Sequence, residues 1–256
     1  MIYITGDTHA DFTRFGRKHF KDYKKMTKND YMIICGDFGG IWDYLISGKS
    51  ERYTLDWLNE LPFTILFVDG NHENFDRLNA DFPVIDYKGG KAHQISDNIY
   101  HLMRGYVFTL ENKKFFAFGG ASSHDIQDGI IDPTQYPSLT DAYHVYKANE
   151  RKGMWQRIKY ISWWEQELPT NEEMQRGIEE LAKVNFEVDY VITHCLPQDV
   201  ATMAGYFQPD ILTNYFSALI TEHHLKFTKW HCGHYHQEEQ LMGKFVIHYE
   251  NIERIN

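Results

Sequence analysis

Short apolar stretches recur along the chain, and each ends at or just before a glycine or a polar residue. They are four to six residues long and rich in Ile, Val, Phe and Tyr, which is typical of buried β-strands rather than helices. The pattern predicts strands at residues 2–5, 31–35, 63–68, 190–193 and 229–232.

Helical patterns lie between these strands, most clearly at residues 170–184. Thr170 and Glu173 fit a capping box at the start of this helix, and Met174, Ile178 and Leu181 form one apolar stripe along it. Alternation of strands and helices predicts an α/β fold with βαβ units, in which binding sites lie at the carboxyl ends of the strands.

Two hairpins are predicted as well, at residues 106–118 and 241–249. Antiparallel hairpins in a βαβ chain indicate a mixed sheet or a second packed sheet. The sequence has no linker, repeat or low-complexity segment. We therefore expect a single domain over residues 1–256, with insertions around 41–60 and 121–170.

Composition narrows the possible partners. The 256 residues include 26 Lys and Arg against 36 Asp and Glu, a formal net charge of −10, which disfavours binding to duplex nucleic acid. There is no secretory signal pattern, no apolar run of the ~20 residues that a membrane helix needs, and no CxxC spacing among the three cysteines. We expect a cytoplasmic protein that does not bind membranes.

The polar residues that follow the predicted strands offer metal-binding side chains. Asp7 and His9 are two apart in an extended segment, so both point to the same face, and His234 and His236 repeat this spacing. Three further candidates follow other strands: Asp37, Asn71 and His194.

Taken singly, each of these residues is more simply explained as a turn former, a helix cap or an ordinary histidine. Seven at the same sheet edge favour a metal site. Mixed nitrogen and oxygen donors without thiolate favour Mn, Fe, Zn, Co or Ni. Seven ligands are more than one tetrahedral ion can bind. If Asp37 bridges two ions, each ion has four ligands. Two such ions would attract a phosphate dianion.

In this order, the motifs resemble those of the calcineurin-like metallophosphoesterases. They are Gly6-Asp7-Thr8-His9, Gly36-Asp37, Gly70-Asn71-His72-Glu73, Thr193-His194 and Gly233-His234-Tyr235-His236. The resemblance implies a four-layer αββα sandwich with two central mixed sheets. It also implies two divalent ions, with manganese the first choice. One would be held by Asp7, His9, Asp37 and His236, and the other by Asp37, Asn71, His194 and His234.

The resemblance further implies in-line attack of a metal-bound hydroxide on phosphorus, with His72 as the general acid for the leaving oxygen. One motif departs from the family pattern: many relatives have a second Asp where Gly40 stands, often followed by Arg. This leaves open which carboxylate orients His72, with Asp43, Glu73 and Asp76 as candidates, and makes a protein phosphatase less favoured.

Residues beyond the metal motifs indicate the substrate less directly. Arg104 could pair with a phosphate and His124 could line the pocket, although an ordinary surface arginine and loop histidine explain them equally well. Trp155, Trp163 and Trp164, with Arg151 and Arg157, could stack on a base, although such aromatic residues more often belong to the core.

Three functions are compatible with these features. The first is hydrolysis of a small phosphomonoester or phosphodiester, with nucleotides among the candidates. The second is a nuclease, which the acidic charge disfavours. The third is a scaffold without activity, which should have lost ligands that this chain retains. The sequence leaves the oligomeric state open.

Overall fold

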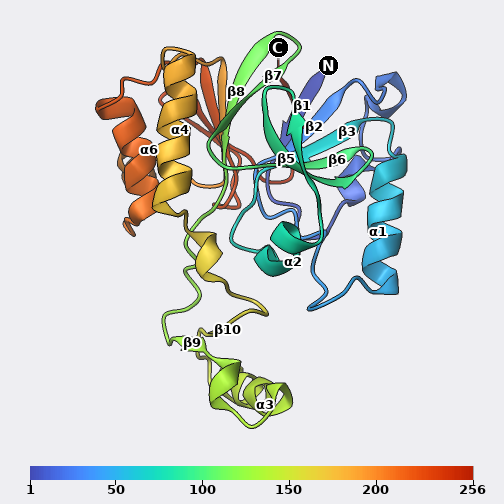
Figure 1. Cartoon of the computed structure of the whole chain (residues 1–256), viewed down its shortest axis with the longest axis vertical. Coiled ribbons are helices and arrows are strands. Elements are labelled where there is room, and N and C mark those ends of the chain that lie inside the picture. Colours follow the sequence, from blue (N-terminus) through green and yellow to red (C-terminus); the bar gives the residue numbers. More distant parts are fainter. Residues whose placement is uncertain (256) are drawn as a thin grey trace.

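Two mixed β-sheets pack face to face in the computed structural model, which describes residues 1–255 (Figure 1). The first sheet has seven strands in the order β15 (Glu253–Ile255), β1 (Ile2–Thr5), β2 (Tyr31–Ile34), β3 (Thr64–Phe67), β6 (Ile99–Leu102), β5 (Gly90–Ser96) and β4 (Val84–Tyr87). Strands β1, β2, β3 and β6 are parallel, and β15, β5 and β4 each pair antiparallel.

The second sheet has six strands in the order β13 (Glu239–Leu241), β14 (Phe245–Ile247), β12 (Lys229–Cys232), β11 (Tyr190–Thr193), β8 (Lys113–Phe118) and β7 (Tyr106–Leu110). Its four inner strands are parallel, and the edge strands β13 and β7 are antiparallel to their neighbours. All five strands predicted from the apolar pattern are present in the two sheets, with ends that differ by at most one residue, and both predicted hairpins form.

Alternating side chains fill the space between the sheets. Ile2 and Ile4 of β1 point inward and belong to one buried cluster with Ala117 and Ile192 of the second sheet, whereas Tyr3 packs on the outer side. This period of two is what a strand with both faces buried requires. The central core therefore fixes the two sheets against each other.

Helices cover both outer faces, which completes the expected four-layer αββα arrangement (Figure 1). Helices α1 (Lys49–Glu60) and α2 (Phe75–Ala80) lie on the first sheet, where Leu58 and Leu78 join its outer core. Helices α4 (Asn171–Lys183), α5 (Gln198–Met203) and α6 (Ile211–Thr221) lie on the second. Thr170 and Glu173 form the predicted capping box of α4.

Residues 124–163 leave this body and form a separate projection, which we call the arm (Figure 1). The arm contains β9 (Ile130–Ile131), α3 (Leu139–Glu150) and β10 (Arg157–Ile158), and it has a small core of its own around Ala142. Short 3-10 helices lie at Thr13–Phe15, Tyr23–Lys25, Pro133–Gln135 and Glu165–Glu167. Over residues 1–255, no helix is both long and apolar enough to cross a bilayer.

Candidate metal centre

The seven candidate ligands meet where the two sheets present the carboxyl ends of their strands. In the first sheet, Asp7 and His9 follow β1, Asp37 follows β2 and Asn71 follows β3. In the second sheet, His194 follows β11, and His234 and His236 follow β12. Because the central strands of both sheets are parallel, their carboxyl ends bring these residues to one edge, as expected for an open α/β fold.

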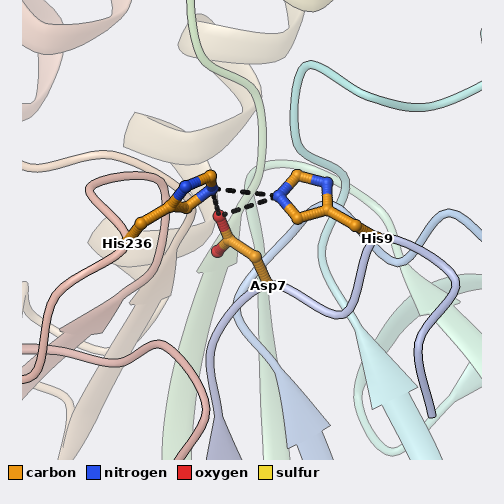
Figure 2. Close-up of side chains that lie close together, drawn as sticks. All are labelled: Asp7, His9 and His236. Carbon is orange, nitrogen blue, oxygen red and sulfur yellow. Dashed lines mark hydrogen bonds and ion pairs between the residues drawn. The ribbon is translucent and has the colours of Figure 1, made fainter.

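Asp7, His9 and His236 form one group (Figure 2). The Nε2 atom of His236 lies 3.1 Å from Asp7 Oδ2, and His9 Nε2 lies 3.6 Å from the same oxygen. The two imidazole Nε2 atoms are 3.0 Å apart. Asp7 is buried, whereas the two histidine side chains are 33% and 49% exposed, so this group opens to solvent.

Asp37, His194 and Asn71 form a second, fully buried group. The Nε2 atom of His194 lies 3.3 Å from Asp37 Oδ2 and 3.2 Å from Asn71 Oδ1, while its Nδ1 atom lies 2.7 Å from the carbonyl oxygen of Cys35. That carbonyl orients the ring, leaving Nε2 directed at the oxygen donors.

His234 completes this side of the centre through its ring and its backbone. The backbone N–H of His234 donates to Asp7 Oδ1 at 2.9 Å. Its ring lies edge-on to His194, with centroids 5.0 Å apart, and also contacts the ring of His124 at 5.3 Å. His234 thus lies between the buried group and the residues that follow β8.

Four of the seven candidate ligands have a left-handed backbone, which side chains other than glycine rarely adopt. The φ angles are 43° at His9, 46° at Asp37, 69° at His234 and 50° at His236. Such conformations cost free energy and are found where the surrounding structure imposes them, often at functional sites. Contacts with the rest of the fold therefore hold the loops in this conformation, and the loops in turn hold the side chains in position.

The glycines of the motifs allow the loops to approach one another closely. A Cβ atom at Gly233 would overlap the carboxylate of Asp7, and one at Gly70 would overlap the carboxylate of Asp37. Glycine at these two positions is therefore needed for the carboxylates to occupy their places.

Charges of opposite sign are paired in the centre. Burial lowers the pKa of His194, but the carboxylates of Asp37 and Asp7 outweigh burial and raise this pKa to about 10. Burial raises the pKa of Asp37, but His194 outweighs it and holds this pKa well below its usual value. Burial lowers the pKa of His234 to about 3, so that imidazole is neutral and able to bind a metal.

The donor set fits divalent transition metals. Three overlapping groups each bring one nitrogen or oxygen atom per residue within 4.8 Å of the others: Asp7 with His9 and His236, Asp7 with Asp37 and His194, and Asp37 with His9 and His72. Imidazole and carboxylate donors without thiolate suit Mn, Fe, Zn, Co or Ni. A cation would also relieve the repulsion between the two buried carboxylates.

His72 lies beside this cluster and contacts the arm. Its backbone N–H donates to Asp37 Oδ1 at 2.7 Å, and its ring nitrogens Nδ1 and Nε2 each lie 3.1 Å from a terminal guanidinium nitrogen of Arg157. Burial lowers the pKa of His72 to about 4; Asp37 opposes this shift and Arg157 adds to it.

The three carboxylates considered for orienting His72 are engaged elsewhere. Glu73 accepts the backbone N–H of Phe38 at 2.7 Å, Asp76 accepts the indole N–H of Trp164 at 2.9 Å, and Asp43 accepts the N–H of Gly48. An arginine therefore occupies the place beside His72 where the sequence suggested a carboxylate.

The two candidate substrate residues lie in different surroundings. His124 lines a cavity of about 590 Å³ together with Asp37, Asn71 and His72. Arg104 is buried outside that cavity. Its Nε donates to Asp69 Oδ2 at 2.9 Å, and Nη2 donates to the carbonyl of Gln166 at 2.7 Å. Asp69 lies at the carboxyl end of a buried strand, where its charge needs a cationic partner. The pair of Arg104 and Asp69 therefore serves the fold.

Sequence reasoning missed Ser123, Glu167 and Asp125. The Oγ atom of Ser123 accepts from Asn71 Nδ2 at 3.2 Å, and its backbone N–H donates to the buried Glu167. Burial raises the pKa of Glu167 to about 8. Ser123 follows β8 as the ligands follow their strands, and this signal could have identified it. Asp125 binds Arg157, and no local pattern indicates that pair.

The tryptophan platform, the less favoured of the two interpretations of these residues, is not assembled. Trp164 is buried against Phe75 of α2, whereas Trp155 is 53% exposed in the arm. The arginine of this stretch that reaches the site is Arg157.

Comparison with known proteins gives a family match. The family model described as "Calcineurin-like phosphoesterase" matches residues 1–238. No curated protein matches the sequence. Among solved structures, a similar chain is a "putative 5′-nucleotidase from Staphylococcus aureus in complex with alpha-ketoglutarate", with a TM-score of 0.43 and 15% identity. The comparison covers 98% of this chain and 49% of that one, so this chain spans about half its length.

Proposed function

The chain belongs to the calcineurin-like phosphoesterases, and we propose that it hydrolyses a small phosphomonoester or phosphodiester at a centre of two divalent metal ions. The observation that carries this proposal is the convergence of seven nitrogen and oxygen donors from both sheets beside one cavity. The family is metal-dependent, and the clustered Asp and His side chains are its candidate ligands.

The two groups of side chains support the division of ligands. Asp7, His9, Asp37 and His236 would hold one ion, and Asp37, Asn71, His194 and His234 the other. Contacts of Asp37 support its place in both sets, since its Oδ2 atom lies 3.7 Å from His9 Nδ1 and 3.3 Å from His194 Nε2. Manganese is the first metal to test, and Fe, Zn, Co and Ni are alternatives with the same donor preference.

When bound, a pair of divalent ions activates water for attack on phosphorus and neutralises the phosphoryl charge. His72 would supply the proton for the leaving oxygen. Its lowered pKa keeps the imidazole neutral in the ligand-free protein, but a phosphate dianion within 4–6 Å favours the protonated form. Substrate binding would therefore prepare the acid.

The cavity supports a substrate with an organic group beyond the phosphate. At about 590 Å³ it is much larger than a phosphate needs, and its wall away from the metal ligands includes Tyr206, Phe207 and Gln208. Phe207 is 70% exposed and could pack against a flat group such as a base. Nucleotides are therefore among the substrates to test.

A metal-reconstituted screen tests the proposal. Protein stripped with EDTA and reloaded with Mn²⁺ should cleave p-nitrophenyl phosphate, bis-p-nitrophenyl phosphate, a cyclic nucleotide or a dinucleotide, and Asp37→Asn should abolish this activity. His223→Gln, a change remote from the centre, is the matched control. If the protein binds fewer than about one ion per chain and cleaves none of the esters, the alternative of a scaffold without activity would be favoured.

A further inference from the structure

The arm reaches the candidate site with Arg157 of β10, which contacts His72, and with His124 and Gln127, which line the cavity. The guanidinium of Arg157 is held by Asp125, whose two oxygens accept from Nε and Nη2 at 2.6 Å each. The carbonyl of Ser162 accepts from Nη1 at 2.9 Å. These contacts come from the arm itself, and the Arg157 side chain is only 12% exposed. The arm therefore fixes the orientation of this guanidinium.

The side of the guanidinium that faces His72 has more donors than acceptors. Nη1 and Nη2 lie 3.1 Å from the two ring nitrogens of His72. A neutral imidazole has one acceptor nitrogen, and a protonated imidazole has none. At least one charged N–H of Arg157 therefore lacks an acceptor beside the cavity, and an unsatisfied charged donor in a partly buried place favours binding of an anion.

Besides the proposed metal ions, a phosphate in the cavity would be stabilised by a positively charged side chain. Of the described residues that line it, none is lysine or arginine. The family position for an arginine after the second strand is also unfilled, since Gly40 is followed by Ile41. Arg104, the arginine expected from sequence, is paired with Asp69 outside the cavity. Arg157 contacts His72, which lines the cavity and lies beside the ligand Asn71.

We propose that Arg157 is the phosphate-binding arginine of this protein, delivered by the arm, and that Asp125 positions it. The inference rests on the proposed function. A fork of two N–H groups suits two oxygens of one phosphoryl group. A monoester presents a dianion with three such oxygens, whereas a diester presents a monoanion with two. Both esters offer two oxygens to the fork, but the dianion attracts the guanidinium charge more strongly, so Arg157 should favour phosphomonoesters.

The test compares Arg157→Gln, Arg157→Lys and Asp125→Asn with Arg151→Gln, an arm arginine that is exposed. In Mn²⁺-loaded protein, Arg157→Gln should lower kcat/KM for p-nitrophenyl phosphate by about 10- to 100-fold and for bis-p-nitrophenyl phosphate by much less. Arg157→Lys and Asp125→Asn should fall between it and the wild type. Arg151→Gln should match the wild type on both esters.

Calorimetric titration with inorganic phosphate gives a readout independent of turnover. Arg157→Gln should weaken phosphate binding by about the same 10- to 100-fold, and Arg151→Gln should not. Unchanged phosphate affinity and an unchanged ratio of monoester to diester cleavage would overturn the role of Arg157, even with an active enzyme. If the wild type cleaves no ester, the proposed function fails, and the titration still decides whether Arg157 binds phosphate. If Arg157→Gln does not fold, the same measurements on Arg157→Lys and Asp125→Asn are compared with those on the wild type and on Arg151→Gln.

Discussion

The Nε2 atom of His194 lies 3.3 Å from Asp37 Oδ2, and the two residues follow strands of different sheets. This contact joins the ends of β2 and β11, on opposite sides of the central core. A metal ion held by both residues would therefore connect the two sheets directly, in addition to the apolar contacts between them.

Metal removal should consequently lower thermal stability as well as activity. At a metal concentration 100 times the Kd, binding stabilises the folded state by about 2.7 kcal/mol. For a chain of this size, that corresponds to roughly 5–10 °C in Tm. Differential scanning calorimetry with and without EDTA measures the shift. His194→Ala should lose most of the metal-dependent shift, and His223→Gln should keep it; equal shifts in both variants would contradict a bridge through His194.

His72→Ala should impair turnover most for poor leaving groups. A general acid contributes about 10²–10⁴ in rate when the leaving oxygen must be protonated. p-Nitrophenolate leaves without a proton, so the variant should lose much less activity on p-nitrophenyl phosphate than on an alkyl phosphate. Steady-state kcat on both esters measures this difference, and an equal loss on the two would exclude the leaving-group role.

Gly233→Ala should abolish tight metal binding. The added methyl group overlaps the Asp7 carboxylate and would displace it from His9 and His236. Metal content after dialysis against Mn²⁺ reports the loss. Gly243→Ala is the control for replacing a glycine without this overlap: Gly243 has a positive φ of 69°, which Gly233 does not have, and no heavy atom lies within 4 Å of its added Cβ. It should cost about 1 kcal/mol of stability without changing metal content. Similar metal loss in both variants would show that the overlap with Asp7 is not the cause.

Acidification should destabilise the fold through buried histidines away from the metal centre. His248 is 1% exposed, and burial lowers its pKa to about 4, against about 6.5 in an unfolded chain. Between these values the unfolded state binds a proton that the folded state does not. The free energy of unfolding should therefore fall as pH drops from 6.5 toward 4, by up to about 1.4 kcal/mol per pH unit for this group.

Chemical denaturation of the EDTA-treated protein at several pH values measures this slope. His248→Gln should reduce it, because the titrating group is gone. The same substitution at the exposed His144 should leave it unchanged. An identical slope in His248→Gln and wild type would show that other groups dominate acid unfolding.

Much of the two-sheet body could be predicted from the local pattern of apolar and polar residues. Apolar runs ending at ligand-type residues identified the central strands, because such strands are buried on both faces and their ends share one sheet edge. Strands β4, β5 and β6 were missed. In β4, the exposed Val84 and Asp86 alternate with two half-buried residues at the sheet edge, so there is no continuous apolar run. Strand β15, with two of its three residues exposed, gives a similarly weak signal.

The surroundings of the metal residues could not be predicted in the same way. Arg104 and Arg157 are both flanked by apolar as well as polar residues, and local sequence does not distinguish them. Asp69 binds the first and Asp125 the second, and each pairing depends on how distant segments pack. The contact between Arg157 and His72 spans 85 residues and exists only because the arm folds back to the sheet edge.

The contact between His9 and His236 has a consequence for biosynthesis. These residues are 227 positions apart, and their Nε2 atoms lie 3.0 Å from each other. At 5–20 residues per second, a ribosome needs roughly 10–45 s to synthesise the intervening chain. During that interval the nascent protein displays Asp7 and His9 without their distant counterparts. A metal ion held by both histidines would therefore bind only after most of the chain has been synthesised, and it could not initiate folding.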